Sequence, residues 1–547
     1  MQWTQIYDPL GHWWLSTLVA ALPIIVLFGM LAGLKVKPHW CAIAGASTAV
    51  AVAIVFFKMP PALAAISFGY GVAFGALKIA WIVLAAVYLY DISVETGQFE
   101  IMKESVAGIT PDRRLQVLLV AFCFGALIEG AAGFGAPVAI AGAFMIGLGF
   151  KPFHAAALNL IANTAPVAWG AIGTPVHTLA AVTALPESDL NAMIGRILPI
   201  LALLLPFWLV CTMTNWASTL EVWPGLLICG GVAAAIQFYW SNFQDSALVD
   251  IVGGMTTLVA LALFFRIWKP KTVWRYLHEP AAKDTPHSHS GFEILHAWSP
   301  FLLMAALVIV WGMPVVKKIL DPTTLSIPVP GLHMQVVRVP PVVDKVEYQE
   351  AKFDLAWLSS VGTATFLAGL LSGPILGMSL RRTLEIFFRT CYRMRFSMAA
   401  ILAMLGLGFV TRYSGMDAVM GLAMTHTGRL YPFFGTLLGW LGVALTGTDA
   451  GSNALFGSLQ VITANRLGLS PVLMAAANSA GGVMGKMISA ESIIVACAAV
   501  GEEGKEGDLF RAVLPHSIVL AALVGLIVYF FSSAGQAWVP AGRVWGH

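Results

Sequence analysis

Long apolar stretches, separated by short polar turns, recur along almost the whole chain. A transmembrane helix needs about 20 predominantly apolar residues to cross the hydrocarbon core of a bilayer. The pattern therefore predicts an all-α polytopic membrane protein with about 12–14 transmembrane segments. The stretches that carry this prediction are 16–34, 41–57, 61–71, 72–90, 115–150, 153–172, 194–213, 224–239, 248–265, 297–313, 355–378, 397–410, 433–445, the region of Asp449, 471–500 and 513–531.

One of these stretches is interrupted around a single carboxylate. Between Leu115 and Phe150 the only charged residue is Glu129, and the surrounding sequence FCFGALIEGAAGFGAPVAI is rich in glycine. A lone carboxylate at membrane depth is costly and marks a functional site by default. Glycine and proline weaken a helix, and a broken helix is tolerated in a bilayer only where it is buried in protein or lines a cavity. The stretch therefore predicts a broken or re-entrant helix at a substrate or ion site.

The second half of the chain carries a similar segment, WLGVALTGTDAGSNALFGSL, which begins at Trp440. From Tyr431 to Asn465 its only charge is Asp449. Each half thus contains one glycine-rich apolar segment with one lone carboxylate.

Composition strengthens the membrane prediction and narrows the possible partners. Hydrophobic residues make up 58% of the 547 positions and charged residues 11%, with a mean hydropathy of +0.81, whereas a soluble protein averages about 25% charged residues. The net charge of +3, without a dense basic tract, gives no indication of nucleic acid binding. The six cysteines show no CxxC spacing and are interpreted as packing residues. No basic segment precedes the first apolar run, so a cleaved signal peptide is not expected.

Four features recur in the same order in both halves, which indicates an internal repeat. Each pair begins 315 to 318 positions apart. The pairs are Thr96-Gly97 with Ser414-Gly415, Glu129-Gly130 with Thr446-Gly447, Asn163-Thr164 with Asn478-Ser479, and the segments that begin at Arg196 and Arg511.

The charges of the loops predict how the two halves are oriented. One membrane topology makes the basic sites at Lys35, Arg113, Lys269 and Arg381–Arg395 all cytoplasmic. This topology places the N-terminus outside and inverts one repeat relative to the other. The expected divisions are a first transmembrane half over 1–268, a cytoplasmic linker over 269–296 and a second transmembrane half over 297–547. The three histidines 278, 287 and 289 of the linker are interpreted as residues of a solvated loop, so no metal site or cofactor is expected.

The interrupted helices predict an anion site. Half-helix N-termini attract anions, and the stretches 130–135, 447–452 and 481–485 are candidates for such ends. Lys486 stands in a mostly apolar run, where it would neutralise a carboxylate, pair with Glu491 or extend to the interface. The proton-coupling candidates are Glu129 and Asp449, and the substrate-binding candidates are Gly130, Gly133, Gly135, Asn163, Thr164, Thr446, Ser452, Asn453, Asn478, Ser479 and Lys486.

The chain resembles the bacterial L-lactate permease family, which includes the glycolate permeases. The blocks that carry the resemblance are WTQIYDPLG at Trp3, EGAAGFGAPVAI at Glu129, NTAPVA at Asn163, GWLGVALTGTDAGSNALFGSLQ at Gly439 and GGVMGKMIS at Gly481. The sequence departs from the family pattern at Asp91, Trp169, Thr174, Thr448, Ala450, Gly451 and Glu491.

That resemblance implies uptake of L-lactate, and often of D-lactate or glycolate, coupled to proton entry across the bacterial inner membrane. The resulting hypothesis is a proton-coupled symporter, with a small monocarboxylate, protons and the lipid bilayer as its partners; a homodimer is left open. The alternatives are a sodium-coupled carrier, a membrane-embedded enzyme and a channel. Neither HExxH nor GxSxG is present, and the phosphate-loop pattern fails at Met487, so the motifs do not favour an enzyme.

Overall fold

The computed structural model describes residues 2–30, 34, 36–133, 136–276, 289–343, 345–502 and 504–540. Within this part of the chain, nine helices are long and apolar enough to cross a membrane, or up to eleven if two bent helix pairs each count as one span. The all-α polytopic prediction is confirmed. The nine spans are Pro38–Val55 (α2), Pro61–Glu95 (α3, Pro61–Phe74, and α4, Trp81–Glu95), Arg113–Ala131 (α6, Arg113–Val117, and α7, Gly125–Ala131), Glu187–Met213 (α11), Trp223–Phe243 (α13), Ser246–Ile267 (containing α14, Val249–Ile267), Gly291–Trp311 (within α15, Gly291–Gly312), Leu380–Ser414 (α18) and Glu506–Ser532 (α24).

The bent pairs and the shorter helices complete the bundle. The segments Pro152–Ala162 (α9) and Val167–Thr183 (containing α10, Gly170–Thr183) meet at 63°, and Pro471–Ile488 (containing α22, Pro471–Gly485) meets Glu491–Val500 (within α23, Ala490–Val500) at 42°. The remaining helices are α1 (Trp13–Phe28), α5 (Gln98–Ala107), α8 (Ala136–Gly147), α12 (Trp216–Glu221), α16 (Pro314–Leu320), α17 (Val361–Ile375), α19 (Met416–Met424), α20 (Tyr431–Thr446) and α21 (Asp449–Leu467).

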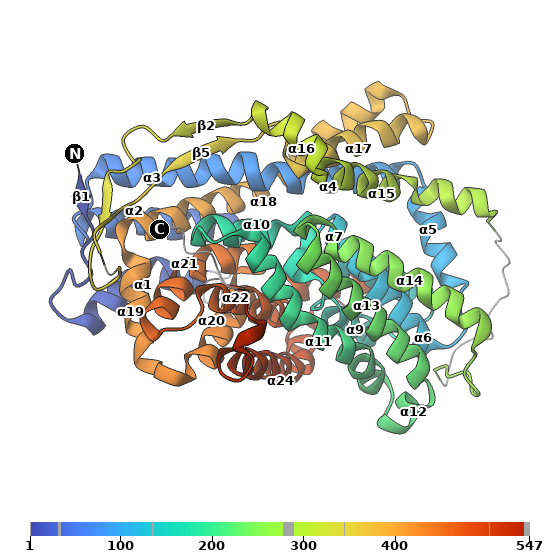
Figure 1. Ribbon diagram of the computed structural model, residues 1–547. Helices are drawn as coiled ribbons and strands as arrows, with labels where there is room; N and C mark the ends of the chain where they lie inside the picture. Colours follow the sequence, from blue (N-terminus) through green and yellow to red (C-terminus); the bar gives the residue numbers. More distant parts are fainter. Residues whose placement is uncertain are drawn as a thin grey trace.

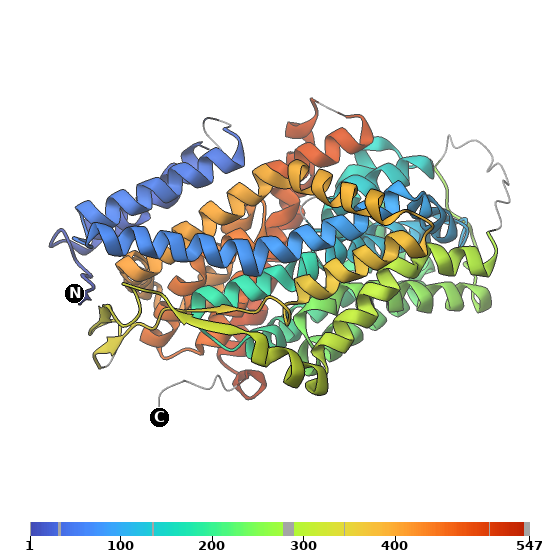
Figure 2. The ribbon, with the colours of Figure 1, turned by 90° about the horizontal axis from the view of Figure 1, so that it is seen from above.

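Two long helices run side by side across the molecule, as Figures 1 and 2 show: the continuous α3–α4 segment and α18. Each has 35 residues, about 52 Å of helix, which exceeds the hydrocarbon thickness of about 30 Å. The hydrophobic pattern predicts separate elements, with breaks near Gly71 and Phe396, and this prediction is wrong. A Cβ at Gly71 would lie 2.5 Å from the Leu405 carbonyl oxygen, so this glycine allows the two helices to approach closely and does not end one of them.

Helices of equal length occur at equivalent positions in the two halves. The 35-residue helices begin at Pro61 and Leu380, and two 27-residue helices begin at Glu187 and Glu506, in both cases 319 positions apart. The two bent pairs begin at Pro152 and Pro471, again 319 positions apart. The inverted orientation and the domain boundaries stay predictions.

The polar segment after α16 forms two small sheets. In one of them β1 (Trp3–Thr4) pairs in parallel with β3 (Val336–Arg338), which pairs antiparallel with β4 (Glu347–Tyr348). In the other, β2 (Leu325–Pro328) pairs antiparallel with β5 (Lys352–Leu355). The first sheet therefore ties the start of the chain to a loop that follows it by more than three hundred positions.

The core consists mainly of two apolar clusters. The larger includes residues of α11, α13, α14, α22 and α24, and the smaller includes residues of α1, α2, α18 and α19. Helices α10 and α21 contribute to both clusters, for example through Leu179 and Val182 of α10. These two helices therefore connect the two clusters.

Candidate functional site

Three chain interruptions converge on one small cavity of about 30 Å³. Helix α7 ends at Ala131, and α21 begins at Asp449 with the Thr448 side chain capping its first turn. At the start of α10, three consecutive residues, Ala171 to Gly173, have left-handed backbone angles. The lining residues are Glu129, Gly133, Val167, Gly170, Ala171, Thr174, Pro175, Thr448, Asp449, Ala450 and Lys486.

The carboxyl of Asp449 lies at the head of a buried hydrogen-bond chain. Its Oδ2 accepts from the Ser479 hydroxyl and, at 3.3 Å, from Asn453 Nδ2, which also donates to the Pro175 carbonyl at 3.1 Å. Asn478 Nδ2 donates in turn to Asn453 Oδ1 at 3.0 Å. The other Asp449 oxygen, Oδ1, has no hydrogen-bond partner among the described residues, so it is available to a proton or ligand.

Four predicted polar residues therefore belong to one connected group around Asp449: Ser452, Asn453, Asn478 and Ser479. The Ser452 hydroxyl donates to the Gly439 carbonyl at 3.1 Å and accepts from Asn478 at 3.4 Å. All four side chains are completely buried. Their mutual hydrogen bonds hold the Asp449 carboxyl in one orientation.

Glu129 reaches the same cavity from the end of α7. Its side chain is 3% exposed, and its Oε2 lacks a hydrogen-bond partner within the described part of the chain. A Cβ at Gly170 would lie 2.5 Å from Glu129 Oε1, so only glycine at 170 leaves room for this carboxyl. Glu129 and Asp449, which are 320 positions apart, thus line one space.

Lys486 supplies a cation to this cavity. Its Nζ donates to the Gly447 carbonyl at 2.7 Å, and its side chain is 2% exposed, so it does not extend to an interface. The charge of Lys486 acts on the carboxyls of Glu129, Asp449 and Glu491. Among the described residues no ion pair that includes Lys486 lies within 4.0 Å, so Lys486 acts on the three carboxyls from a distance and the predicted pair with Glu491 is not formed.

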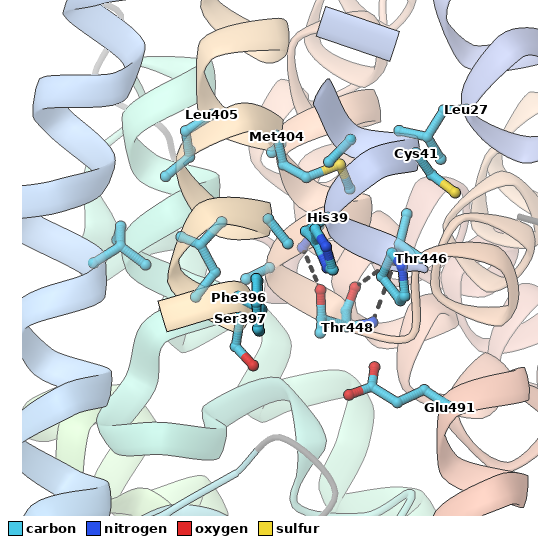
Figure 3. A pocket seen from close by; sticks show the side chains of 18 of the residues that line it. Leu27, His39, Cys41, Phe396, Ser397, Met404, Leu405, Thr446, Thr448 and Glu491 are labelled. Carbon is cyan, nitrogen blue, oxygen red and sulfur yellow. Dashed lines mark hydrogen bonds between the residues drawn. The ribbon is translucent and has the colours of Figure 1, made fainter. Parts of the chain in front are cut away.

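A much larger cavity of about 410 Å³ adjoins the small one, because Thr174, Thr448 and Ala450 line both. Figure 3 shows the Thr446–Thr448 loop with the Glu491 carboxyl below it and the side chains of His39 and Phe396 nearby. The rings of His39 and Phe396 stack with their centroids 4.8 Å apart. The Thr446 hydroxyl bonds to the carbonyls of Gly442 and Thr448, so it shapes the loop at the border of the two cavities.

The predicted glycines have different positions. Gly133 lines the small cavity with a left-handed φ of 57°, and its N–H donates to the Glu129 carbonyl at 3.0 Å. A Cβ at Gly130 would lie 2.8 Å from Asp250 Cβ, so Gly130 is a packing residue and not a cavity residue. Gly135 lies outside the described residues. Positions 481–485 were predicted to begin a half-helix, but they form the C-terminal end of α22. Their glycines let α22 pack closely against α20.

The last two predicted polar residues are buried but are not among the residues that line the cavity. Asn163 lies near the Glu129 carboxyl, and neither of its amide atoms has a hydrogen bond of normal geometry to a described residue. The Thr164 hydroxyl donates to the Ile161 carbonyl at 2.7 Å, which is a local bond within its own turn.

The sequence analysis missed three polar residues. Tyr431 donates to Gln460 Oε1 at 2.7 Å, and Gln460 Nε2 donates to Asn478 Oδ1 at 3.1 Å, so both extend the hydrogen-bond chain of Asp449. The third, Asp250, is 2% exposed and begins an apolar helix. The lone-charge criterion that identified Glu129 also applies to Asp250, because no other charged residue follows in its stretch before Arg266.

Comparisons with known proteins decide the family. The family model described as L-lactate permease matches residues 16–533. This chain belongs to the L-lactate permease family. It is 45% identical to the glycolate permease GlcA of Escherichia coli (strain K12) over 99% of both chains, and 44% identical to the L-lactate permease of the same strain over 96% of this chain and 97% of the relative.

A solved structure, that of the YdaH transporter of Alcanivorax borkumensis, is 15% identical and superposes with a TM-score of 0.45 over 87% of this chain and 89% of that one. Membership of a permease family, together with the membrane-length helices, makes this chain a multi-pass transporter of the bacterial inner membrane.

Proposed function

We propose that this permease takes up L-lactate and related 2-hydroxymonocarboxylates, D-lactate and glycolate, together with protons. The proposal rests on one observation: a lysine, two buried carboxyls and the N-terminus of a 19-residue helix, α21, meet at one cavity. The names of the relatives, L-lactate permease and glycolate permease, support the substrate class.

The anion is held by Lys486 and the first turn of α21. Backbone N–H groups at a helix N-terminus point toward a bound anion, and the helix dipole favours its negative charge. The small cavity of about 30 Å³ is too small for a whole hydroxy acid. The substrate carboxylate therefore enters it, while the rest of the hydroxy acid occupies the adjoining part of the large cavity beside Thr448 and Thr174.

The proton is carried by Glu129 and Asp449. A buried carboxylate with an unpartnered oxygen is costly, and it is stabilised either by a cation or by a proton. When the substrate anion occupies Lys486, the carboxyls lose part of that cation's support, and protonation compensates for the loss. Binding of the anion and of the proton are thereby coupled.

The test is uptake of labelled L-lactate into proteoliposomes with an inward proton gradient and no sodium. We expect accumulation above the equilibrium level, abolished by a protonophore, and its loss in Glu129→Gln or Asp449→Asn. Asp508→Asn is the control, because this aspartate is 65% exposed in the first turn of α24. Accumulation that requires a sodium gradient would establish the sodium-coupled alternative. Equilibration without accumulation would indicate a channel, and a covalently changed lactate an enzyme.

A further inference from the structure

Asp250 is a buried acid whose carboxyl has neither a hydrogen bond nor an ion pair with a described residue. It is the second residue of α14 (Val249–Ile267) and is 2% exposed. Neither of its carboxyl oxygens has a hydrogen-bond partner among the described residues, and none of the ion pairs formed in this part of the chain includes it.

Asp250 lies beside the helix end that carries Glu129. Helices α7 and α14 approach closely because Gly130 and Gly254 lie in their interface: a Cβ at Gly130 would meet Asp250 Cβ at 2.8 Å, and one at Gly254 would meet the Leu127 amide nitrogen at 2.9 Å. Glu129 is the charged group that acts on Asp250, whereas Glu129 itself also faces Lys486 and Glu491. Two neighbouring buried carboxyls cannot both be ionised at low cost, so the pair holds a proton.

The two acids lie near different spaces. Glu129 lines the small central cavity. Asp250 lies one helical turn after Ser246, in the segment that Asp245 begins, and Asp245, Glu187 and His177 line a separate cavity of about 390 Å³. The Ser246 hydroxyl donates to Glu187 at 2.7 Å, and Glu187 pairs with His177 Nδ1 at 2.9 Å. The segment of Asp250 is therefore connected to this polar cavity through Asp245 and Ser246, whereas Asp250 itself lies beside Glu129.

We propose that Asp250 relays protons between this second cavity and Glu129. A proton on the Asp250 carboxyl passes to the ionised Glu129 carboxyl, so that Asp250 becomes ionised as Glu129 becomes neutral and the charge of the pair does not change. A proton delivered from the second cavity through the Asp245–Ser246 segment then reprotonates Asp250. This inference rests on the proposed function, because it names the route by which the coupled proton reaches Glu129.

A purely structural role makes a different prediction. An acid in the first turn of a helix stabilises the helix through its dipole. In that case, removing the charge of Asp250 would lower thermal stability and would lower every transport mode together. A relay residue is needed only for net proton movement, so lactate-for-lactate exchange, which moves no net proton, would survive its removal.

The test compares two transport modes in proteoliposomes that contain wild type, Asp250→Asn, Asp250→Glu or Asp508→Asn. Asp508 is the matched control because it also lies in the first turn of a membrane helix. We expect Asp250→Asn to keep exchange within about threefold of wild type and to lose at least about tenfold in proton-driven accumulation. Asp250→Glu restores the carboxyl and is expected to recover accumulation.

Wild-type accumulation by Asp250→Asn would overturn the relay and leave the proposed function intact. Equal losses of exchange and accumulation in Asp250→Asn that elutes as a single folded species would also overturn it, in favour of a structural role. Absence of proton-driven accumulation in the wild type itself would overturn the proposed function and the relay with it.

Discussion

Individual glycines determine where the central carboxyls lie. Gly170 and Gly482 each face one carboxyl oxygen, Oε1 of Glu129 and Oδ1 of Asp449, at distances that a Cβ would not allow. Neither glycine has a left-handed φ, so what each position requires is space and not an unusual backbone conformation. Substitution at these positions therefore tests the position of the carboxyls without straining the main chain.

Gly170→Ala is expected to displace the Glu129 carboxyl and to lower lactate uptake. A displacement of about 1 Å in a site can cost on the order of 100-fold in rate, and we expect a loss of about 10–100-fold in Vmax/KM for proton-driven uptake. Gly147→Ala is the control, because a Cβ there would have no heavy atom of a described residue within 4 Å. Equal uptake by the two variants would show that the position of Glu129 does not limit transport.

At the scale of elements, charged side chains tie the two long helices together near the end of α4. Asp91, only 6% exposed, accepts from Arg393 at 2.6 Å and from the Thr390 hydroxyl at 2.5 Å. Glu95, on the next turn, accepts from Arg389 at 2.6 Å and also pairs with Arg382. The arginine-rich start of α18, which the sequence analysis separated from the following span, is thus the part that binds α4.

A double-mutant cycle on Asp91→Asn and Arg393→Gln measures this connection. Because Arg393 is 54% exposed, we expect a coupling free energy of only about 0.5–1.5 kcal/mol. Asp91→Asn alone is expected to cost about 1–3 kcal/mol, because it also weakens the bond from Thr390. Thermal unfolding in detergent gives both values, and additive effects of the two substitutions would show that the pair contributes nothing.

A second connection joins α6 (Arg113–Val117), α12 and the segment after α14 through the fully buried Arg114. Its guanidinium donates to Asp112 at 2.8 Å and to Glu221 at 2.9 Å, and Glu221 also accepts from Thr272 at 2.8 Å. Hydrogen bonds from Arg114 and Thr272 hold the pKa of Glu221 below its ordinary value of 4.5. A carboxyl with a lowered pKa in the folded state stabilises that state above its ordinary pKa and loses the effect as the pH falls through the lowered value.

Glu221→Gln is therefore expected to lower the melting temperature at pH 7, with a difference from wild type that shrinks as the pH falls below 4.5. Melting curves of both proteins between pH 7 and the acid range measure the difference. A gap that stayed constant across this range would show that the charge of Glu221 is not what stabilises the connection.

At the scale of the whole molecule, the pairing of β1 with β3 places the start of the chain beside the loop between α16 and α17. The two segments must therefore lie on the same side of the membrane. The predicted topology places the N-terminus outside the membrane, so this loop is also expected outside. It places Lys271, in the predicted linker, on the cytoplasmic side.

Cysteine labelling tests this orientation. In a background without the six native cysteines, Ser326→Cys and Gln2→Cys are expected to react with a membrane-impermeant maleimide in intact cells, whereas Lys271→Cys is expected to react only after permeabilisation. All three positions are exposed. The opposite pattern of labelling would invert the predicted orientation of both halves.

Sequence alone was sufficient for the class of protein and for two of its central acids. The membrane prediction depends on hydrophobicity, which adds up along the chain whatever the contacts are, so it needed no tertiary information. Glu129 and Asp449 stand out because the cost of a lone charge in an apolar stretch is likewise a local property. The family could be predicted from long blocks of sequence. The criterion of a lone charge in an apolar stretch would also have identified Asp250.

Tertiary structure alone decided which residues meet. Glycine has several uses that look identical in a sequence: Gly71 and Gly130 allow close packing of helices, Gly133 takes a left-handed turn, and Gly170 makes room for a carboxyl. Likewise, the partner of Lys486 is a backbone carbonyl 39 positions earlier, and Glu129 faces Asp250 across 121 positions. Such contacts depend on how helices distant in the chain pack together, and hydrophobic patterning, which is local, does not determine that packing.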